Sequence, residues 1–211
     1  MILNNCLVLC GGVDPNSFVR TPWRCRLLCD SLVSQLSQDP WKGKVINYHE
    51  DSPQLELIQG GDDLRYKYEF VRRRMITCNH PDFSEMFDLI LEEAVKRNLK
   101  PEQMVKKGFV FNHPGFKRFL KLHVWKYIYN NIKSKFGDKG YGNVVPHFVL
   151  WNLSEYKKNK PVIPYKQPGL TVLTGFSNKL LKLFLENDGE FGHVMEVAIS
   201  GDEFQSLAVV D

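Results

Sequence analysis

The spacing of apolar and polar positions predicts a chain in which strands and helices alternate. The first strand is an unbroken apolar run, Cys6–Cys10, that ends at two glycines. A run without polar alternation is typical of a strand covered on both faces, as in a parallel sheet. Of the other strands, the third alternates for most of its length, which predicts an antiparallel edge strand. These further strands are expected at 44–49, 54–59, 108–111, 147–151 and 170–173.

The segments between the strands carry helix signals. Proline suits the first turn of a helix, so Thr21-Pro22 predicts a helix to about Gln38, with a buried stripe of Leu28, Leu32 and Leu36. An amphipathic helix is expected at about 82–98, with a core face of Phe83, Met86, Phe87, Ile90, Leu91 and Ala94. Other helices are expected at about 62–74, 116–136, 177–186 and 194–199.

Strands that alternate with helices form a doubly wound α/β sheet with right-handed crossovers. We therefore predict one domain over residues 1–211. Its mostly parallel six-stranded sheet should have the order 3-2-1-4-5-6, with strand 3 antiparallel at the edge and a switch point between strands 1 and 4.

The composition agrees with a globular domain that has no membrane partner. The chain has 211 residues, of which 43% are hydrophobic and 25% charged, enough for a sizeable core. No apolar stretch approaches the roughly 18 residues of a membrane-spanning helix, and the N-terminus lacks the pattern of a secretory signal. Five cysteines without a Cys-x-x-Cys pair indicate reduced thiols and an intracellular protein, cytoplasmic or nuclear.

Positive charge is concentrated between Lys117 and Lys182, where only Asp138 and Glu155 oppose the basic residues. Such a bias is more often a solvated face than a binding surface. It also permits an RNA-binding face, interleaved with the aromatic residues Trp125, Tyr127, Tyr129, Tyr141, Tyr156 and Tyr165. The candidate residues of this nucleic-acid face are Lys117, Arg118, Lys121, Lys157, Lys158 and Lys160.

Several longer motifs carry a resemblance. They include N-C-L-V-L-C, P-W-K-G-K-V-I, L-I-Q-G-G-D-D-L, D-F-S-E-M-F-D-L-I-L, K-G-Y-G-N-V-V-P-H-F-V-L-W-N-L and G-F-S-N-K-L-L-K-L-F-L-E-N-D-G. From about Asn4 to Asp211 the chain resembles a family of plant proteins of unknown function whose carboxyl-terminal part is a von Willebrand factor A-like domain. It is more distantly similar to the A-like domain of the Ro ribonucleoprotein autoantigen. The resemblance implies the doubly wound fold and no established activity.

The resemblance also implies where a metal ion would bind. A-like domains commonly hold a divalent cation with an Asp-x-Ser-x-Ser motif after the first strand, a Thr from a second loop and an Asp after the fourth strand, because Mg²⁺ and Ca²⁺ prefer oxygen ligands. The matching positions here are Gly11, Val13, Pro15, Pro81 and His113, whose side chains offer no oxygen. We therefore expect a degenerate metal-ion-dependent adhesion site, with no metal and no cofactor.

Two alternative metal sites stay open at this point. Asp14 could replace the lost carboxylate, with Asn16 as a second oxygen ligand, although sliding the strand to bring Asp14 into place would expose the apolar face of the strand. Cys10, His80 and His113 could form a softer, zinc-like site, although no ligand-spacing motif supports it.

These observations favour a non-catalytic protein-interaction domain, with RNA association through the basic segment as the alternative. The sequence has no Gly-x-Ser-x-Gly elbow, no G-x-G-x-x-G pattern and no P-loop, so an enzyme is the least favoured class. Neither the protein partner nor the oligomeric state follows from the sequence. The candidate partner-binding rim consists of Asp14, Asn79, His80, Asp82, Asn112, His113 and Trp151, and for Trp151 core packing is the favoured alternative role.

Overall fold

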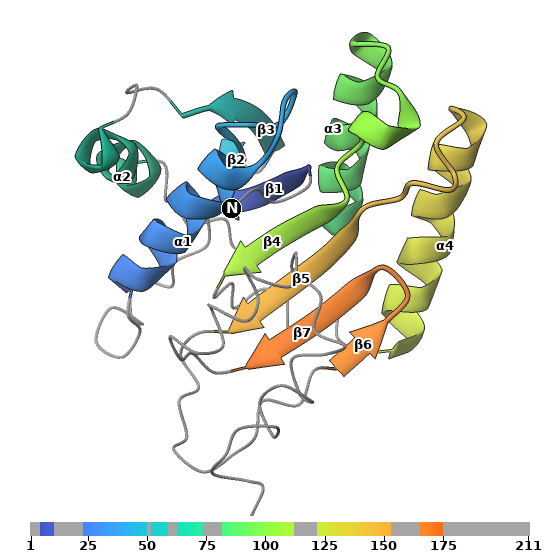
Figure 1. Ribbon diagram of the computed structural model, residues 1–211. Helices are drawn as coiled ribbons and strands as arrows, with labels where there is room; N and C mark the ends of the chain where they lie inside the picture. Colours follow the sequence, from blue (N-terminus) through green and yellow to red (C-terminus); the bar gives the residue numbers. More distant parts are fainter. Residues whose placement is uncertain are drawn as a thin grey trace, which may run out of the picture.

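A single mixed sheet with helices on both faces organises the chain (Figure 1). The computed structural model describes residues 5–10, 23–49, 52–58, 63–73, 82–111, 122–152 and 165–174. The strands are β1 (Cys6–Cys10), β2 (Lys44–His49), β3 (Ser52–Leu57), β4 (Lys107–Phe111), β5 (His147–Asn152), β6 (Tyr165–Gln167) and β7 (Leu170–Thr174). The helices are α1 (Trp23–Leu36), α2 (Leu64–Arg73), α3 (Phe83–Lys96) and α4 (Leu122–Asp138), with a short 3-10 turn, η2 (Pro101–Gln103).

The strand order is β3-β2-β1-β4-β5-β7-β6. The inner pairs are parallel, and β3 runs antiparallel to β2, so the six predicted strands and their order are confirmed. The structure adds β6, antiparallel to β7, in a stretch that the sequence pattern assigned to a loop. The predicted helices at 177–186 and 194–199 lie outside the described residues.

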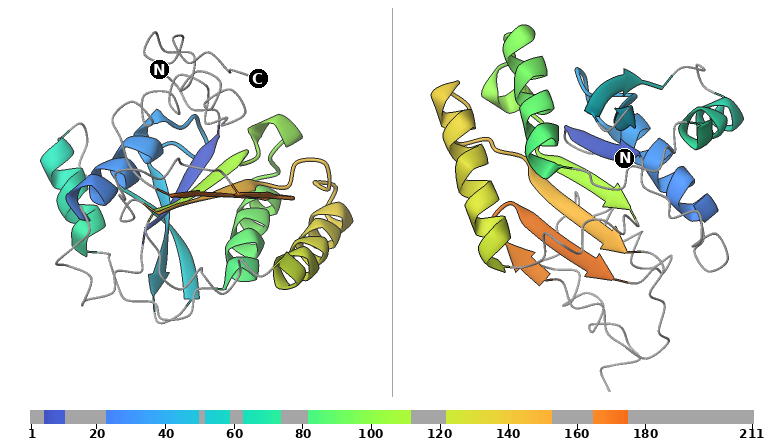
Figure 2. Two further views of the ribbon diagram at one scale, coloured as in Figure 1. Left: turned by 90° about the horizontal axis from the view of Figure 1, so that it is seen from below. Right: turned by 180° about the vertical axis from the view of Figure 1, so that it is seen from behind.

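Helices α3 and α4 cover one face of the sheet, and α1 and α2 lie on the other (Figure 2). Side chains of β1 alternate between the two resulting cores. Leu7 and Leu9 belong to the core under α3 and α4, whereas Cys6, Val8 and Cys10 belong to the core under α1. All five are buried, which confirms the expectation of a central strand covered on both sides.

Aromatic rings fill the core under α3 and α4. The ring of Phe148 on β5 lies 5.7 Å from that of Phe83 and 4.8 Å from that of Phe87, both on α3. Gly108 makes room for it, because a Cβ atom there would lie 2.5 Å from Cε1 of Phe148. The predicted core face of α3 is confirmed, and the ring of Trp125 joins this cluster from α4.

Helix α1 buries a mixture of apolar and small polar side chains, among them Val33, Ser31 and Ser34. The prediction of a buried leucine stripe is wrong for Leu32, which is 39% exposed. The structure describes the backbone of Leu28 but not its side chain. Serine hydroxyl groups form hydrogen bonds with the backbone here. The Oγ atom of Ser37, just after α1, accepts from the amide of Cys6 at 2.9 Å. The Oγ atom of Ser34 donates to the carbonyl of Ser31 at 2.8 Å. Small side chains let a helix lie close to a sheet, and these hydrogen bonds offset the cost of burying their hydroxyls.

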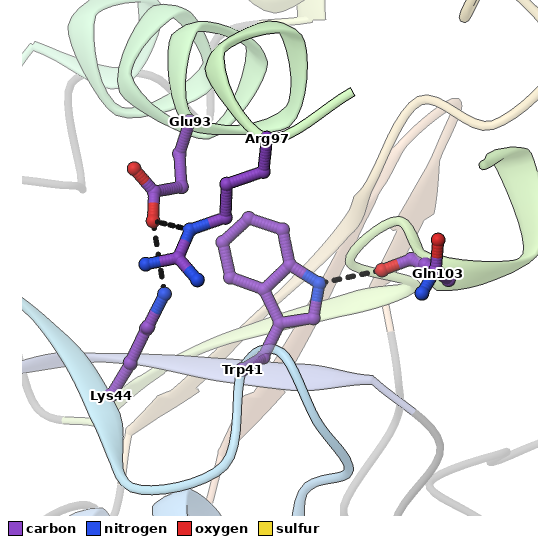
Figure 3. Close-up of polar contacts among 5 residues, drawn as sticks. All are labelled: Trp41, Lys44, Glu93, Arg97 and Gln103. Atoms are coloured by element: carbon purple, nitrogen blue, oxygen red, sulfur yellow. Dashed lines mark hydrogen bonds and ion pairs between the residues drawn. The ribbon is translucent and has the colours of Figure 1, made fainter. Parts of the chain in front are cut away.

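An ion-pair network ties β2 to α3 (Figure 3). Oε1 of Glu93 accepts from Nζ of Lys44 at 2.9 Å and from Nε of Arg97. Lys44 also lies 5.5 Å from the ring centre of Trp41, whose indole N–H donates to the carbonyl of Gln103 at 2.6 Å. The carboxyl side chain of Glu93 is 15% exposed, and such a partly buried ion pair is screened less than a surface pair. Burial acts to raise the pKa of Glu93, but the hydrogen bonds from Lys44 and Arg97 outweigh it and lower the pKa.

The substitution Glu93→Gln should reduce the free energy of unfolding by about 1–3 kcal/mol at neutral pH, because two cations lose their anionic acceptor. Because the folded-state pKa of Glu93 lies below the ordinary 4.5, its stabilisation is complete above that value and is lost as the pH falls through the folded-state pKa. Urea denaturation of both proteins should therefore show a stability gap at pH 7 that narrows in acid. The matched control is Glu92→Gln on the exposed side of α3, which should change little. Equal losses in the two variants would contradict this account.

Candidate functional site

The carboxyl ends of β1, β2, β4, β5 and β7 share one edge of the sheet (Figure 1). Strand β1 lies between β2 and β4, so the chain turns to one side after β1 and to the other side from β4 onward. In open α/β sheets, ligands bind outside the carboxyl ends of the strands at such a switch point. This carboxyl edge is therefore the candidate site.

The two strands at the switch point, β1 and β4, end in buried apolar side chains at this edge. Cys10 ends β1 and Phe111 ends β4, and both are buried. Trp151 is 1% exposed, with its ring 5.9 Å from that of Phe111, and it belongs to the core under α1. The prediction of Trp151 as a partner-binding rim residue is therefore corrected: its large apolar ring packs in the core, the alternative role.

Asp82 caps a helix. Its carboxylate accepts a hydrogen bond from the amide of Ser84 at 2.7 Å, at the start of α3, where the first amides have no partner within the helix. The residue is exposed at the surface. Burial raises the pKa of nearby Glu85, and repulsion from Asp82 and Asp88 raises it further. The structure thus gives Asp82 a local structural task at the position where a rim residue was predicted.

The remaining predicted rim and metal positions lie outside the described residues: Gly11, Val13, Asp14, Pro15, Asn79, His80, Pro81, Asn112 and His113. Within the described ranges, no group of three or more His, Cys, Asp or Glu side chains is placed to hold a metal ion. Both alternative metal sites include positions beyond those ranges, so they remain predictions.

Asn47 is a residue at this edge that the sequence pattern did not single out. It lies on β2 in register with Cys10, and it is buried. Its amide nitrogen is 3.4 Å from Oε1 of Glu56, and its Oδ1 accepts no hydrogen bond from the part of the chain that the structure describes. The available signal was an amide directly after the apolar pair Val45-Ile46 in a strand, where a buried polar group needs a partner.

The basic segment divides its aromatic residues between core and surface. Trp125 and Tyr141 are buried, and each donates a hydrogen bond to a backbone carbonyl: Trp125 to Pro168 at 2.8 Å and Tyr141 to Leu99 at 2.7 Å. Tyr127 is instead 71% exposed. All the candidate basic residues named for the nucleic-acid face lie outside the described residues: Lys117, Arg118, Lys121, Lys157, Lys158 and Lys160.

No helix within the described ranges is both long and apolar enough to cross a membrane. This agrees with the absence of a membrane-spanning stretch in the sequence pattern.

Comparisons with known proteins place the chain beside sequences of unassigned function. A family model described as "Domain of unknown function (DUF7788)" matches residues 22–208. "Uncharacterized protein L728" of Acanthamoeba polyphaga mimivirus is 26% identical over 196 residues, which cover 90% of this chain and 33% of the viral protein. The chain thus spans about a third of the length of this curated relative. No solved structure matches the chain.

The variant Asp82→Ala should lose about 0.5–2 kcal/mol of stability, because the first turn of α3 loses its side-chain cap. Asp82→Asn should retain most of it, since asparagine also caps helices. Asp138→Ala removes a carboxylate at the far end of α4, where an acid is unfavourable, and should cost nothing. Urea denaturation measures all three. An Asp82→Ala protein whose free energy of unfolding equals that of the wild type would contradict the capping role.

Proposed function

The chain belongs to the DUF7788 family, and from this premise we propose that it is a non-catalytic protein-interaction domain with a von Willebrand factor A-like scaffold. In this proposal a partner protein binds at the carboxyl edge of the sheet, without a bridging metal ion.

The observation that carries the proposal is the switch point between β1 and β4. The parallel strands on both sides of it end at one edge, which is where a doubly wound sheet offers a binding crevice. The motif resemblance to A-like domains supports the same edge, because those domains bind their partners there. The antiparallel edge strand β3 is also in agreement with that scaffold.

The chemistry of this edge favours contact through the loops themselves. An A-like domain that binds through a metal needs a carboxylate directly after its first strand, whereas here Gly11 follows Cys10. Phe111 ends β4, and Trp151 lies one residue before the end of β5; both are buried in the core. In this proposal the matched loop positions supply no oxygen ligand for a hard cation, because their side chains carry no oxygen. The rim residues proposed to contact the partner are Asp14, Asn79, His80, Asn112 and His113.

The test is quantitative affinity capture from an extract of the source organism, with the tagged full chain as bait. The double variant Asn112→Ala/His113→Ala should lose the captured partner, because it removes two polar side chains directly after β4. The matched control is Lys106→Ala, an exposed residue immediately before β4, at the opposite edge of the sheet. The proposal would be wrong if the double variant captured as much partner as the wild type, or if the control variant lost as much captured partner as the double variant.

Calorimetric titration tests the metal-free part of the proposal. The wild-type chain should give no saturable heat with Mg²⁺, Mn²⁺, Ca²⁺ or Zn²⁺, because the matched positions lack ligands for them. Saturable Mg²⁺ binding that disappears in Asp14→Ala would establish the alternative oxygen site. Saturable Zn²⁺ binding that disappears in His113→Ala would establish the alternative softer site. Either result would contradict a metal-free edge.

A further inference from the structure

Helix α4 has two chemically different sides. Trp125, Ile132 and Phe136 are buried in the core under α3 and α4. Lys126, Asn130 and Lys133 are exposed and follow one another at the i, i+4 and i+7 spacing that places side chains in one stripe, which lies about 80–140° around the helix from Trp125. Tyr127 is exposed next to Lys126. We call Lys126, Tyr127, Asn130 and Lys133 the α4 outer face.

The ring of Tyr127 is not needed to hold α4 in place. That task falls to its neighbours: the rings of Trp125 and Tyr129 stack at 6.1 Å, and the indole of Trp125 donates to Pro168 in the β6–β7 turn. Gly169 in the same turn lets Tyr129 approach, because a Cβ atom there would overlap its ring. An aromatic ring left 71% exposed beyond this packing is available to stack on another flat ring.

The charge of this face is positive. Asp138, at the carboxyl end, is the single carboxylate in the sequence of α4. Lys135 is neutralised by Asp88 of α3 at 2.6 Å, whereas Lys126 and Lys133 form no ion pair with any residue that the structure describes. From the helical rise, these two ammonium groups originate about 10 Å apart along the axis, which corresponds to about three stacked nucleotides of one strand.

Helix α2 provides an internal comparison. Tyr66 is also exposed, at 56%, and the same helix carries the basic residues Arg65, Lys67, Arg72 and Arg73. However, Glu69 lies on the same helix and pairs with Arg72 at 2.8 Å, so a polyanion would meet a carboxylate there. An exposed tyrosine beside positive charge, without a nearby carboxylate on the same helix face, is therefore found on α4 and not on α2.

We propose that the α4 outer face binds single-stranded nucleic acid, with Tyr127 stacked on a base and Lys126 and Lys133 against flanking phosphates. Asn130, between the lysines, donates and accepts hydrogen bonds with sugar or base edges. Unpaired bases are required because a duplex keeps its ring faces stacked inside. The surface lies on the α3–α4 side of the sheet (Figure 1), so the proposal is independent of protein binding at the carboxyl edge.

The experiment measures fluorescence anisotropy of labelled oligo-uridine and oligo-thymidine, each about 12 nucleotides long, with the full chain at low salt. Tyr127→Ala should weaken binding by about 5- to 150-fold, the loss that removing one stacked ring produces. Tyr127→Trp should retain binding or strengthen it. Lys126→Gln and Lys133→Gln should each reduce the slope of log affinity against log salt by about 0.7, the value for one phosphate contact on a single strand.

Two matched controls separate this face from general basicity. Tyr66→Ala removes the exposed tyrosine of α2, and Lys96→Gln removes an exposed lysine of α3; both should leave the affinity unchanged. Circular dichroism and thermal unfolding confirm that every variant is folded. Binding of both oligonucleotides, or of oligo-uridine alone, supports the proposal provided that Tyr127→Ala weakens it. The absence of binding at low salt, tighter binding to a duplex of equal length, or equal losses in Tyr127→Ala and Tyr66→Ala would overturn it.

Discussion

Strand β1 exposes no side chain on either face, and the rest of the fold has to supply two separate cores around it. Leu7 and Leu9 require the aromatic layer carried by α3, α4 and β5, while Cys6, Val8 and Cys10 require the layer under α1. A strand buried on both faces removes apolar surface on each face from water, and each Å² of that surface stabilises the fold by about 25 cal/mol. It also directs the end of the strand to the edge where ligands bind in doubly wound sheets.

The two cores meet this demand in different ways. On the α3–α4 side, large rings interlock, and Gly108 gives the space that Phe148 occupies. On the α1 side, the sulfur and branched side chains of β1 lie under a helix that buries serines together with Val33, and Ser37 accepts directly from the backbone of Cys6. The network centred on Glu93 then joins β2 to α3, so the helix layer is attached at its edge by charge as well as by packing.

The sheet could be predicted from the sequence because its apolar runs are short, separated and bounded by glycine or proline. The six strands, their order and the antiparallel β3 all followed from that pattern. Strand β6 did not, because three residues carry too little periodicity, although Pro168-Gly169 marked its turn. The predicted stripe on α1 is wrong at Leu32, because a spacing of four identifies one face of a helix but not whether leucines or serines lie against the sheet. The rim residues could be placed only by position in the chain, and burial removed Trp151 from that set.

Helix α4 carries buried and exposed aromatic residues close together in the sequence. Trp125 and Tyr127 are two positions apart, so they project about 200° from each other around the helix. One is buried and hydrogen-bonded to a turn of the sheet, and the other is exposed beside Lys126. Composition treats both as aromatic residues in a basic segment, and only their direction separates a core residue from a surface available for binding. The same reasoning applies at the carboxyl edge, where Phe111 and Trp151 are committed to the core. A partner at that edge, as proposed, would therefore contact the segments that follow the strands, whereas on α4 the helix itself carries the exposed side chains.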